Sequence, residues 1–175
     1  NLIGPTYNTF NWRADVFELK RMLSAIGISV NTVLTADCTV DEIVNAPRAE
    51  LNICMYPYDS GIEVAKKMQE QFSIPYTAGH IPLGFRESAA WLDEIARFFL
   101  IDAQQYIAQE IKSARDFVTT LLVTNTFFEA TAALSTDNCD TYSVGISSFL
   151  KRELGMDVCM ASVATDEALE KVSQV

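Results

Sequence analysis

Five side chains that could take part in chemistry follow predicted strands of the chain. Tyr7 and Asn8 lie in a long, aromatic and amide-rich loop after the first strand. Cys54 and Tyr56 end a later strand, and His80 follows another. Open α/β sheets bind ligands beyond the carboxyl ends of their strands, so these residues are predicted to face a cofactor or substrate cavity. A thiol with a lowered pKa can ligate a metal, and an imidazole can exchange a proton with a ligand.

Each of these residues also has a purely structural interpretation. The aromatic side chains of the loop at 4–12 can pack on the sheet, Cys54 can be a small core hydrophobe, and His80 can bond the backbone. A fourth loop at 135–140 is expected to cap the following helix, with Asp140 as the N-cap residue. The sequence leaves these interpretations open, and it assigns no catalytic residue.

Several common active-site motifs are absent from the sequence. It contains no G-x-x-x-x-G-K-[ST] phosphate loop, no G-x-G-x-x-G dinucleotide fingerprint and no G-x-S-x-G nucleophile elbow. It has one histidine and four cysteines, and no two cysteines form a C-x-x-C pair. Multi-histidine, zinc-ribbon and ferredoxin spacings are therefore excluded, and no metal site is predicted.

The composition indicates an acidic globular protein. Of the 175 residues, 49% are hydrophobic and 21% are charged, and the net charge is -10. Such a charge repels phosphate backbones, so no nucleic-acid partner is expected. No apolar run reaches the ~18 residues of a membrane span. Cys54 and Cys159 lie in apolar strand-like runs as small hydrophobes, and the absence of a disulfide pattern favours a cytoplasmic protein.

Strand-like and helix-like segments alternate along the chain. Strands are expected at residues 1–4, 28–34, 51–56, 74–77, 131–135 and 156–163. Helices are expected at 14–26, 62–72, 88–99, 103–122, 141–154 and from 166. A capping box at Thr39–Glu42 is expected to open a further short helix, and a second box at Ser60–Glu63 to open the helix at 62–72. The alternation predicts an α/β protein with a Rossmann-like parallel sheet and helices on both faces, followed by a partial second Rossmann-like domain.

The expected domains are a Rossmann-like domain at 1–101, a linking long helix and loop at 102–130, and the start of a second Rossmann-like domain at 131–175. Both units run strand, polar loop, helix, glycine and strand, with Gly27 and Gly155 at matching places. This match is either an internal repeat or the pattern common to βαβ units. Because two parallel strands cannot cover a core, the chain is predicted to be a fragment of a longer protein.

The residues around these loops resemble a known family. The segments Asn1–Tyr7, Asn52–Tyr56 and Ile81–Gly84 are similar to the middle domain of nitrogenase component 1-type oxidoreductase subunits. This superfamily includes the nitrogenase molybdenum-iron protein and the light-independent protochlorophyllide reductase B subunit. Further similar residues are Phe10-Asn11, Asp15, Glu18, Leu19, Arg21, Gly27, Val30-Asn31, Phe72–Pro75, Thr136-Asp137 and Phe149–Met156.

The resemblance implies a segment of a nitrogenase-like oxidoreductase that walls a cofactor or substrate cavity and docks a related subunit. In the parent protein it implies an iron-sulfur cluster, a hetero-oligomer, and electron transfer from an ATP-dependent iron-sulfur reductase. The family's cluster-holding cysteines lie mainly in the first of its three domains, so no cofactor and no activity are expected in this segment alone. The cofactor-ligating cysteine of alpha-type subunits is not in register with Cys54, so that role is not transferred.

Two other functions fit the sequence. One is a non-redox, small-ligand-binding α/β module, for which a signal peptide upstream and tight binding by the segment itself are expected. The other is a cluster-assembly scaffold of the same superfamily, which this segment alone does not distinguish from the catalytic component.

Overall fold

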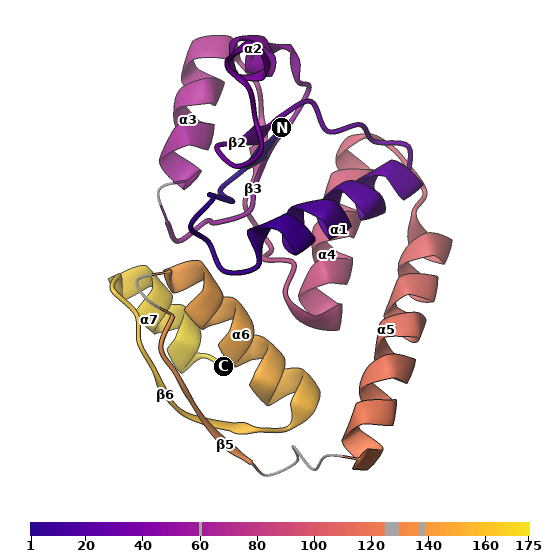
Figure 1. Cartoon of the computed structure of the whole chain (residues 1–175), viewed down its shortest axis with the longest axis vertical. Helices are drawn as coiled ribbons and strands as arrows, with labels where there is room; N and C mark the ends of the chain where they lie inside the picture. Colours follow the sequence, from indigo (N-terminus) through magenta and orange to yellow (C-terminus); the bar gives the residue numbers. More distant parts are fainter. Residues whose placement is uncertain (60, 125–129, 137–138) are drawn as a thin grey trace.

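The computed structural model describes residues 1–59, 61–124, 130–136 and 139–175. The elements form two groups, which we call the N-terminal lobe (residues 1–101) and the C-terminal lobe (residues 131–175). Figure 1 shows the long helix α5 (Gln104–Thr124) running from the first lobe towards the second. None of the described helices combines the length and the apolar character that a membrane crossing requires.

The N-terminal lobe contains four short parallel strands in the order β2-β1-β3-β4. They are β1 (Leu2–Ile3), β2 (Val33–Leu34), β3 (Asn52–Cys54) and β4 (Tyr76–Thr77). The parallel sheet confirms the predicted α/β class. The strands are shorter than predicted, most clearly β2, which among the described residues lies at the edge of the sheet and pairs with the two-residue β1.

Helices cover both faces of this sheet, as Figure 1 shows. Successive strand residues point to opposite faces, so Leu2 and Ile3 enter two different hydrophobic clusters. Leu2 packs with α1 (Trp12–Ala25), α4 (Gly84–Phe98) and the start of α5. Ile3 packs with α3 (Gly61–Phe72) and the 3-10 turn η1 (Ala46–Arg48), which follows α2 (Val40–Asn45).

Local sequence signals account for several helix ends. Thr39 and Glu42 form the predicted capping box at the start of α2. Gly27 has a φ of 83°, and the next amide, that of Ile28, donates to Leu23 O at 2.9 Å, which ends α1 as a Schellman-type turn does. The capping box predicted at Ser60 lies outside the described residues.

Helix α4 begins at Gly84, four residues earlier than predicted. The cause is a residue distant in sequence: the Glu153 carboxylate accepts the backbone N–H groups of Phe85 at 2.6 Å and Arg86 at 3.3 Å. A carboxylate satisfies the free N–H groups of a first helical turn and interacts favourably with the helix dipole. The start of α4 is therefore set by a contact between the lobes.

The C-terminal lobe pairs β5 (Thr131–Leu134) in parallel with β6 (Asp157–Ala161), and α6 (Asp140–Leu154) and α7 (Asp166–Ser173) follow the strands. Cys159 is exposed, which corrects the prediction of a core thiol, because the side chains of both strands stay partly or fully exposed. The N-cap residue of α6 is Cys139, so the prediction of Asp140 was wrong.

The carboxylate of Asp140 stabilises a different turn. It accepts the backbone N–H groups of Ala164 and Thr165, both at 2.8 Å, where β6 leads into α7. The Asp140 side chain is 2% exposed, and these bonds satisfy its charge. Asp140 therefore connects the starts of α6 and α7.

Candidate functional site

A cleft of about 720 Å³ lies at the carboxyl edge of the main sheet, between the two lobes. Its walls come from the loops that follow β1, β3 and β5 and from α6. The lining residues are Gly4, Thr6, Asn8, Thr9, Phe10, Tyr56, Asp59, Gly61, Ser135, Thr136, Cys139, Tyr142 and Ile146. Hydroxyl, amide and aromatic groups dominate this set.

The close packing of β1 against β3 places Tyr56 in the cleft. Gly4 follows β1 with a φ of 131°, and a Cβ built on it would lie 3.0 Å from Tyr56 Cγ. Only glycine leaves room for the tyrosine ring at this point and adopts this backbone conformation without strain. The turn after β1 therefore determines where Tyr56 lies.

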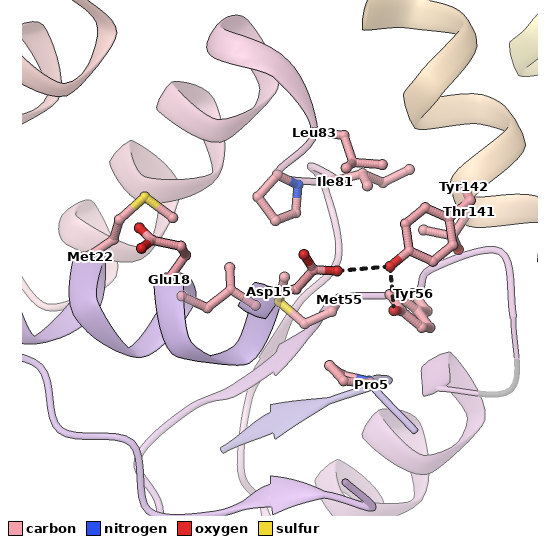
Figure 2. A pocket seen from close by; sticks show the side chains of 12 residues that line it. Pro5, Asp15, Glu18, Met22, Met55, Tyr56, Ile81, Leu83, Thr141 and Tyr142 are labelled. Carbon is pink, nitrogen blue, oxygen red and sulfur yellow. Dashed lines mark hydrogen bonds between the residues drawn. The ribbon is translucent and has the colours of Figure 1, made fainter. Parts of the chain in front are cut away.

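Tyr56 meets Tyr142 of α6, and together they connect the lobes (Figure 2). Their hydroxyl oxygens are 3.2 Å apart, and their rings pack edge to face with centroids 5.7 Å apart. The Tyr142 hydroxyl is also 3.0 Å from Asp15 Oδ2 on α1. We call Asp15, Tyr142 and Tyr56 the interlobe triad.

The two tyrosines of the triad also line a second, smaller pocket of about 120 Å³, which we call the apolar pocket. Asp15 lines this pocket but does not line the cleft. Figure 2 shows the triad beside the pocket's apolar side chains, among them Met55, Ile81 and Leu83. The tyrosine pair is therefore shared by both spaces.

Burial controls the protonation of the triad. It raises the pKa of Asp15, against the hydrogen bonds from Tyr142 and Asn11, which lower it. It also raises the pKa of Tyr142 and Tyr56, because a phenolate would be poorly solvated there. Both tyrosines are therefore neutral at pH 7, and each hydroxyl can donate one hydrogen bond and accept others.

Asp59 holds the first turn of α6 against the N-terminal lobe. Its Oδ2 accepts the backbone N–H of Thr141 at 3.2 Å and the thiol of Cys139 at 3.6 Å. Burial raises the pKa of Cys139 to about 11, and the nearby Asp59 charge adds to the rise, whereas a hydrogen bond with the Tyr142 backbone opposes it. This carboxylate therefore positions the helix that carries Tyr142.

The structure places the five predicted residues in different surroundings. Asn8 and Tyr56 both line the cleft. Tyr7 is 82% exposed and is not among the lining residues. Cys54 is 1% exposed, and burial raises its pKa to about 11. His80 lines a separate pocket between the lobes, with its Nδ1 2.9 Å from a Glu87 carboxylate oxygen.

Sequence reasoning did not select Tyr142, Asp15 or Asp59 as site residues. Two of them carried a usable signal, since Asp15 and Tyr142 lie in the first turns of helices that follow strands. First turns after parallel strands lie at the same sheet edge as the loops. Asp59 follows β3 in the same loop as Tyr56.

The residues of the described chain do not fit an iron-sulfur cluster. Such a cluster requires about four thiolate ligands or their equivalents. No group of three or more His, Cys, Asp or Glu residues in the described ranges is placed to hold a metal ion. Cys54 and Cys139 are neutral thiols at pH 7, because the pKa of each is raised to about 11.

Comparison with known proteins agrees with the fold and with the family resemblance. The family model described as "Nitrogenase component 1 type Oxidoreductase" matches residues 1–174. The light-independent protochlorophyllide reductase B subunit of Heliobacterium modesticaldum is 31% identical over 164 residues, which cover 92% of this chain and 31% of that protein. Its counterpart from Synechocystis sp., which carries the same name, is 29% identical over 168 residues, which cover 92% of this chain and 32% of that protein.

A solved structure titled "Nitrogenase Cp1 at pH 6.5" superposes with a TM-score of 0.71 and 25% identity. The superposition covers 90% of this chain and 29% of that chain. The present chain thus spans about a third of the length of the curated relatives that it matches. With the family model matching nearly every residue, the chain belongs to the nitrogenase component 1 type oxidoreductases.

Proposed function

We propose that this chain forms one wall of a substrate or cofactor cavity in the catalytic component of a nitrogenase-like oxidoreductase. The observation that carries the proposal is the cleft between the lobes, at the sheet edge where open α/β folds bind ligands. In the whole cytoplasmic protein, an ATP-dependent iron-sulfur reductase delivers electrons, and a bound substrate accepts them. The iron-sulfur cluster of the parent is held by residues outside this chain.

The cleft suits a ligand without negative charge. None of the described residues that line it is Lys, Arg or His, and its one carboxylate, Asp59, already bonds the start of α6. Thr6, Asn8 and Thr136 offer neutral hydrogen-bonding groups. Phosphate-binding sites instead commonly use cationic side chains. These features favour an uncharged reacting group in the cleft, such as dinitrogen or the macrocycle of a tetrapyrrole.

We also propose that the exposed aromatic side chains of the loop after β1 and of α1 dock a related subunit. Phe10 in the loop after β1 is 87% exposed, and Phe17 on α1 is 66% exposed. Exposed aromatic side chains are enriched in protein interfaces, and they cost free energy when left in water. The relatives from Heliobacterium and Synechocystis are each named as one subunit of a reductase.

A cavity-filling variant tests the proposal. In the full-length protein, purified without oxygen together with its partner subunit, Ile146→Trp places a large ring in the cleft. The matched control, Val40→Trp, adds the same ring on α2, where Val40 is 75% exposed. With an ATP-dependent reductase and protochlorophyllide or dinitrogen, the wild type and the control are expected to reduce substrate. Ile146→Trp is expected to lose about tenfold or more, because misplacing a substrate by about 1 Å costs up to about a hundredfold.

Three results would count against the proposal. Equal rates of substrate reduction for Ile146→Trp and the control would show that the cleft is not part of the substrate cavity. A full-length protein that reduces no substrate but transfers an assembled cluster to another protein would be a scaffold. Tight ligand binding without an iron-sulfur cluster would indicate a non-redox binding module.

A further inference from the structure

We propose that the interlobe triad, Asp15, Tyr142 and Tyr56, is a proton relay that leads from the surface of α1 to the cleft. The inference rests on the proposed function. A substrate that gains electrons and is to stay neutral must also gain one proton for each electron, and those protons need a path into the cavity.

The triad forms an unbroken line of hydrogen-bonding oxygens. Asp15 Oδ2 lies 3.0 Å from the Tyr142 hydroxyl, and that hydroxyl lies 3.2 Å from the hydroxyl of Tyr56. Figure 2 shows the two bonds meeting at the Tyr142 oxygen. Both distances are short enough for a proton to pass between hydrogen-bonded groups after small movements.

The two ends of the line lie in different environments. Asp15 is half-buried, and its Oδ1 accepts a bond from the exposed side chain of Asn11 at 3.2 Å, so water can reach this end. Tyr56 and Tyr142 line the cleft, which Asp15 does not. The line therefore connects a solvent-accessible acid to two hydroxyls at the proposed cavity.

Protonation of Asp15 reverses the direction of the hydrogen bonds. While Asp15 is ionised, it can only accept, so Tyr142 donates to Asp15 and Tyr56 donates to Tyr142. Once Asp15 carries a proton, it can donate to Tyr142. Tyr142 then donates to Tyr56, or to the nearby carbonyl of Phe10 at 3.3 Å, and Tyr56 is free to donate into the cleft.

The transfer conserves atoms and charge. The O–H bond of Tyr56 breaks as its proton bonds to the reduced substrate, the proton of Tyr142 passes to the Tyr56 oxygen, and the proton of Asp15 passes to the Tyr142 oxygen. A proton from the bulk solvent then reprotonates the Asp15 carboxylate, so the net change is the transfer of one proton from solvent to the substrate. The electrons come from the iron-sulfur reductase of the proposed function, and the triad carries protons only.

The charges around Asp15 suit a proton donor. No described salt bridge involves Asp15, so no cation holds it in the ionised form. On its own helix, Glu18 also lines the apolar pocket and pairs with Arg21 at 2.7 Å. Among the described residues, the titratable group that bonds Asp15 from a facing element is Tyr142, followed along the line by Tyr56, and both are neutral at pH 7. Burial raises the pKa of Asp15, which brings it closer to the working pH of a general acid.

Substitutions in the full-length protein with its partner subunit and reductase test the relay. Asp15→Asn keeps a hydrogen-bonding side chain but cannot carry the proton, and Tyr56→Phe removes the last hydroxyl. Each is expected to lower substrate reduction about tenfold to a hundredfold, as loss of a general acid does. Asp15→Asn is also expected to flatten the dependence of the reduction rate on pH, and Asp15→Glu is expected to restore part of the rate.

The control Tyr106→Phe removes a hydroxyl on α5, outside the triad. It should change neither the rate of substrate reduction nor its pH dependence.

A second measurement separates the relay from the proposed function. With tyrosine ring carbons labelled with carbon-13, the NMR signals of Tyr142 and Tyr56 are expected to shift together as Asp15 titrates, and Asp15→Asn should abolish this shift. Wild-type rates of substrate reduction in Asp15→Asn and Tyr56→Phe would overturn the relay alone. So would a Tyr56 NMR signal that does not shift as Asp15 titrates. A wild type that reduces no substrate would overturn the proposed function, and the relay with it.

Discussion

At the scale of single residues, burial decides what the cysteines of this chain can do. Burial raises the pKa of Cys54 and Cys139 to about 11, so their thiols are protonated at pH 7 and react slowly. Cys159, in contrast, is exposed on β6, although its sequence surroundings are as apolar as those of Cys54. The chemistry of each cysteine thus depends on its burial and not on its residue type.

This difference predicts the order of thiol alkylation. With iodoacetamide at pH 7.5, Cys159 is expected to react first, and Cys54 and Cys139 only when the chain is unfolded, as followed by peptide mass spectrometry. Cys159→Ser should remove the fast phase. Rapid modification of Cys54 in the folded chain would contradict its burial.

Asp15 predicts a pH-dependent effect on stability. Burial raises the pKa of Asp15 in the folded chain, so its ionised form is disfavoured there. Its contribution to stability is fully present below the carboxylate pKa of the unfolded chain, about 4, and is lost as the pH rises through the folded value. Asp15→Asn should therefore be more stable than the wild type at pH 7 and should lose that advantage near pH 4. Urea unfolding at several pH values would show the reverse trend if Asp15 were stabilised as an anion.

At the scale of elements, the first turn of α4 depends on a side chain of α6. The sequence between Gly79 and Glu87 contains no Ser, Thr, Asp or Asn N-cap, and the helix was predicted to begin at Ser88. The Glu153 carboxylate caps the amides of Phe85 and Arg86 instead. This cap forms only when the two helices are packed together.

Removal of the cap should shorten or destabilise α4. Glu153→Ala is expected to lower the free energy of unfolding by about 1–2 kcal/mol, a typical loss for an N-cap acceptor. Glu153→Gln keeps an acceptor oxygen and should lose less. Lys151→Ala, at an exposed site on the same helix, serves as the control in urea unfolding and is expected to stay within about 0.5 kcal/mol of the wild type. Equal losses for Glu153→Ala and Lys151→Ala would contradict the cap.

At the scale of the whole molecule, close packing between the lobes aligns the interlobe triad. Phe85 of α4 meets Phe149 of α6 edge to face, with centroids 6.0 Å apart. A Cβ on Gly84 would lie 2.7 Å from Phe149 Cδ2 and 2.6 Å from Glu153 Oε1. We propose that residues 1–101 and 131–175 are separate domains of the parent, linked through 102–130, and that this contact sets their spacing.

Substitutions at two glycines can distinguish the cost of backbone strain from the cost of overpacking the contact between the lobes. Gly84 and Gly27 have nearly the same positive φ, 82° and 83°, but a Cβ on Gly27 would meet nothing within 4 Å. Gly27→Ala should cost only the left-handed strain, about 1–2 kcal/mol. Gly84→Ala should cost about 1–3 kcal/mol more, because it also overpacks the contact with α6. Equal losses in urea unfolding would mean that the lobes do not pack tightly at Gly84.

The sequence by itself determined the α/β class, the parallel order of the elements and several helix ends. Alternating apolar periodicities, the capping box at Thr39 and the glycines after α1 and α6 act over a few residues, so they can be read locally. Asn8 and Tyr56, both predicted from their places after strands, line the cleft for the same reason.

Only the tertiary structure decided which side chains meet. Tyr56 and Tyr142 are 86 residues apart in sequence, and Asp15 and Tyr142 are 127 apart. The start of α4, the role of Asp140 and the exposure of Cys159 likewise depend on contacts that local patterns do not encode. Burial, pKa and hydrogen-bond partners are properties of the packed surroundings, which form only when distant segments are brought together.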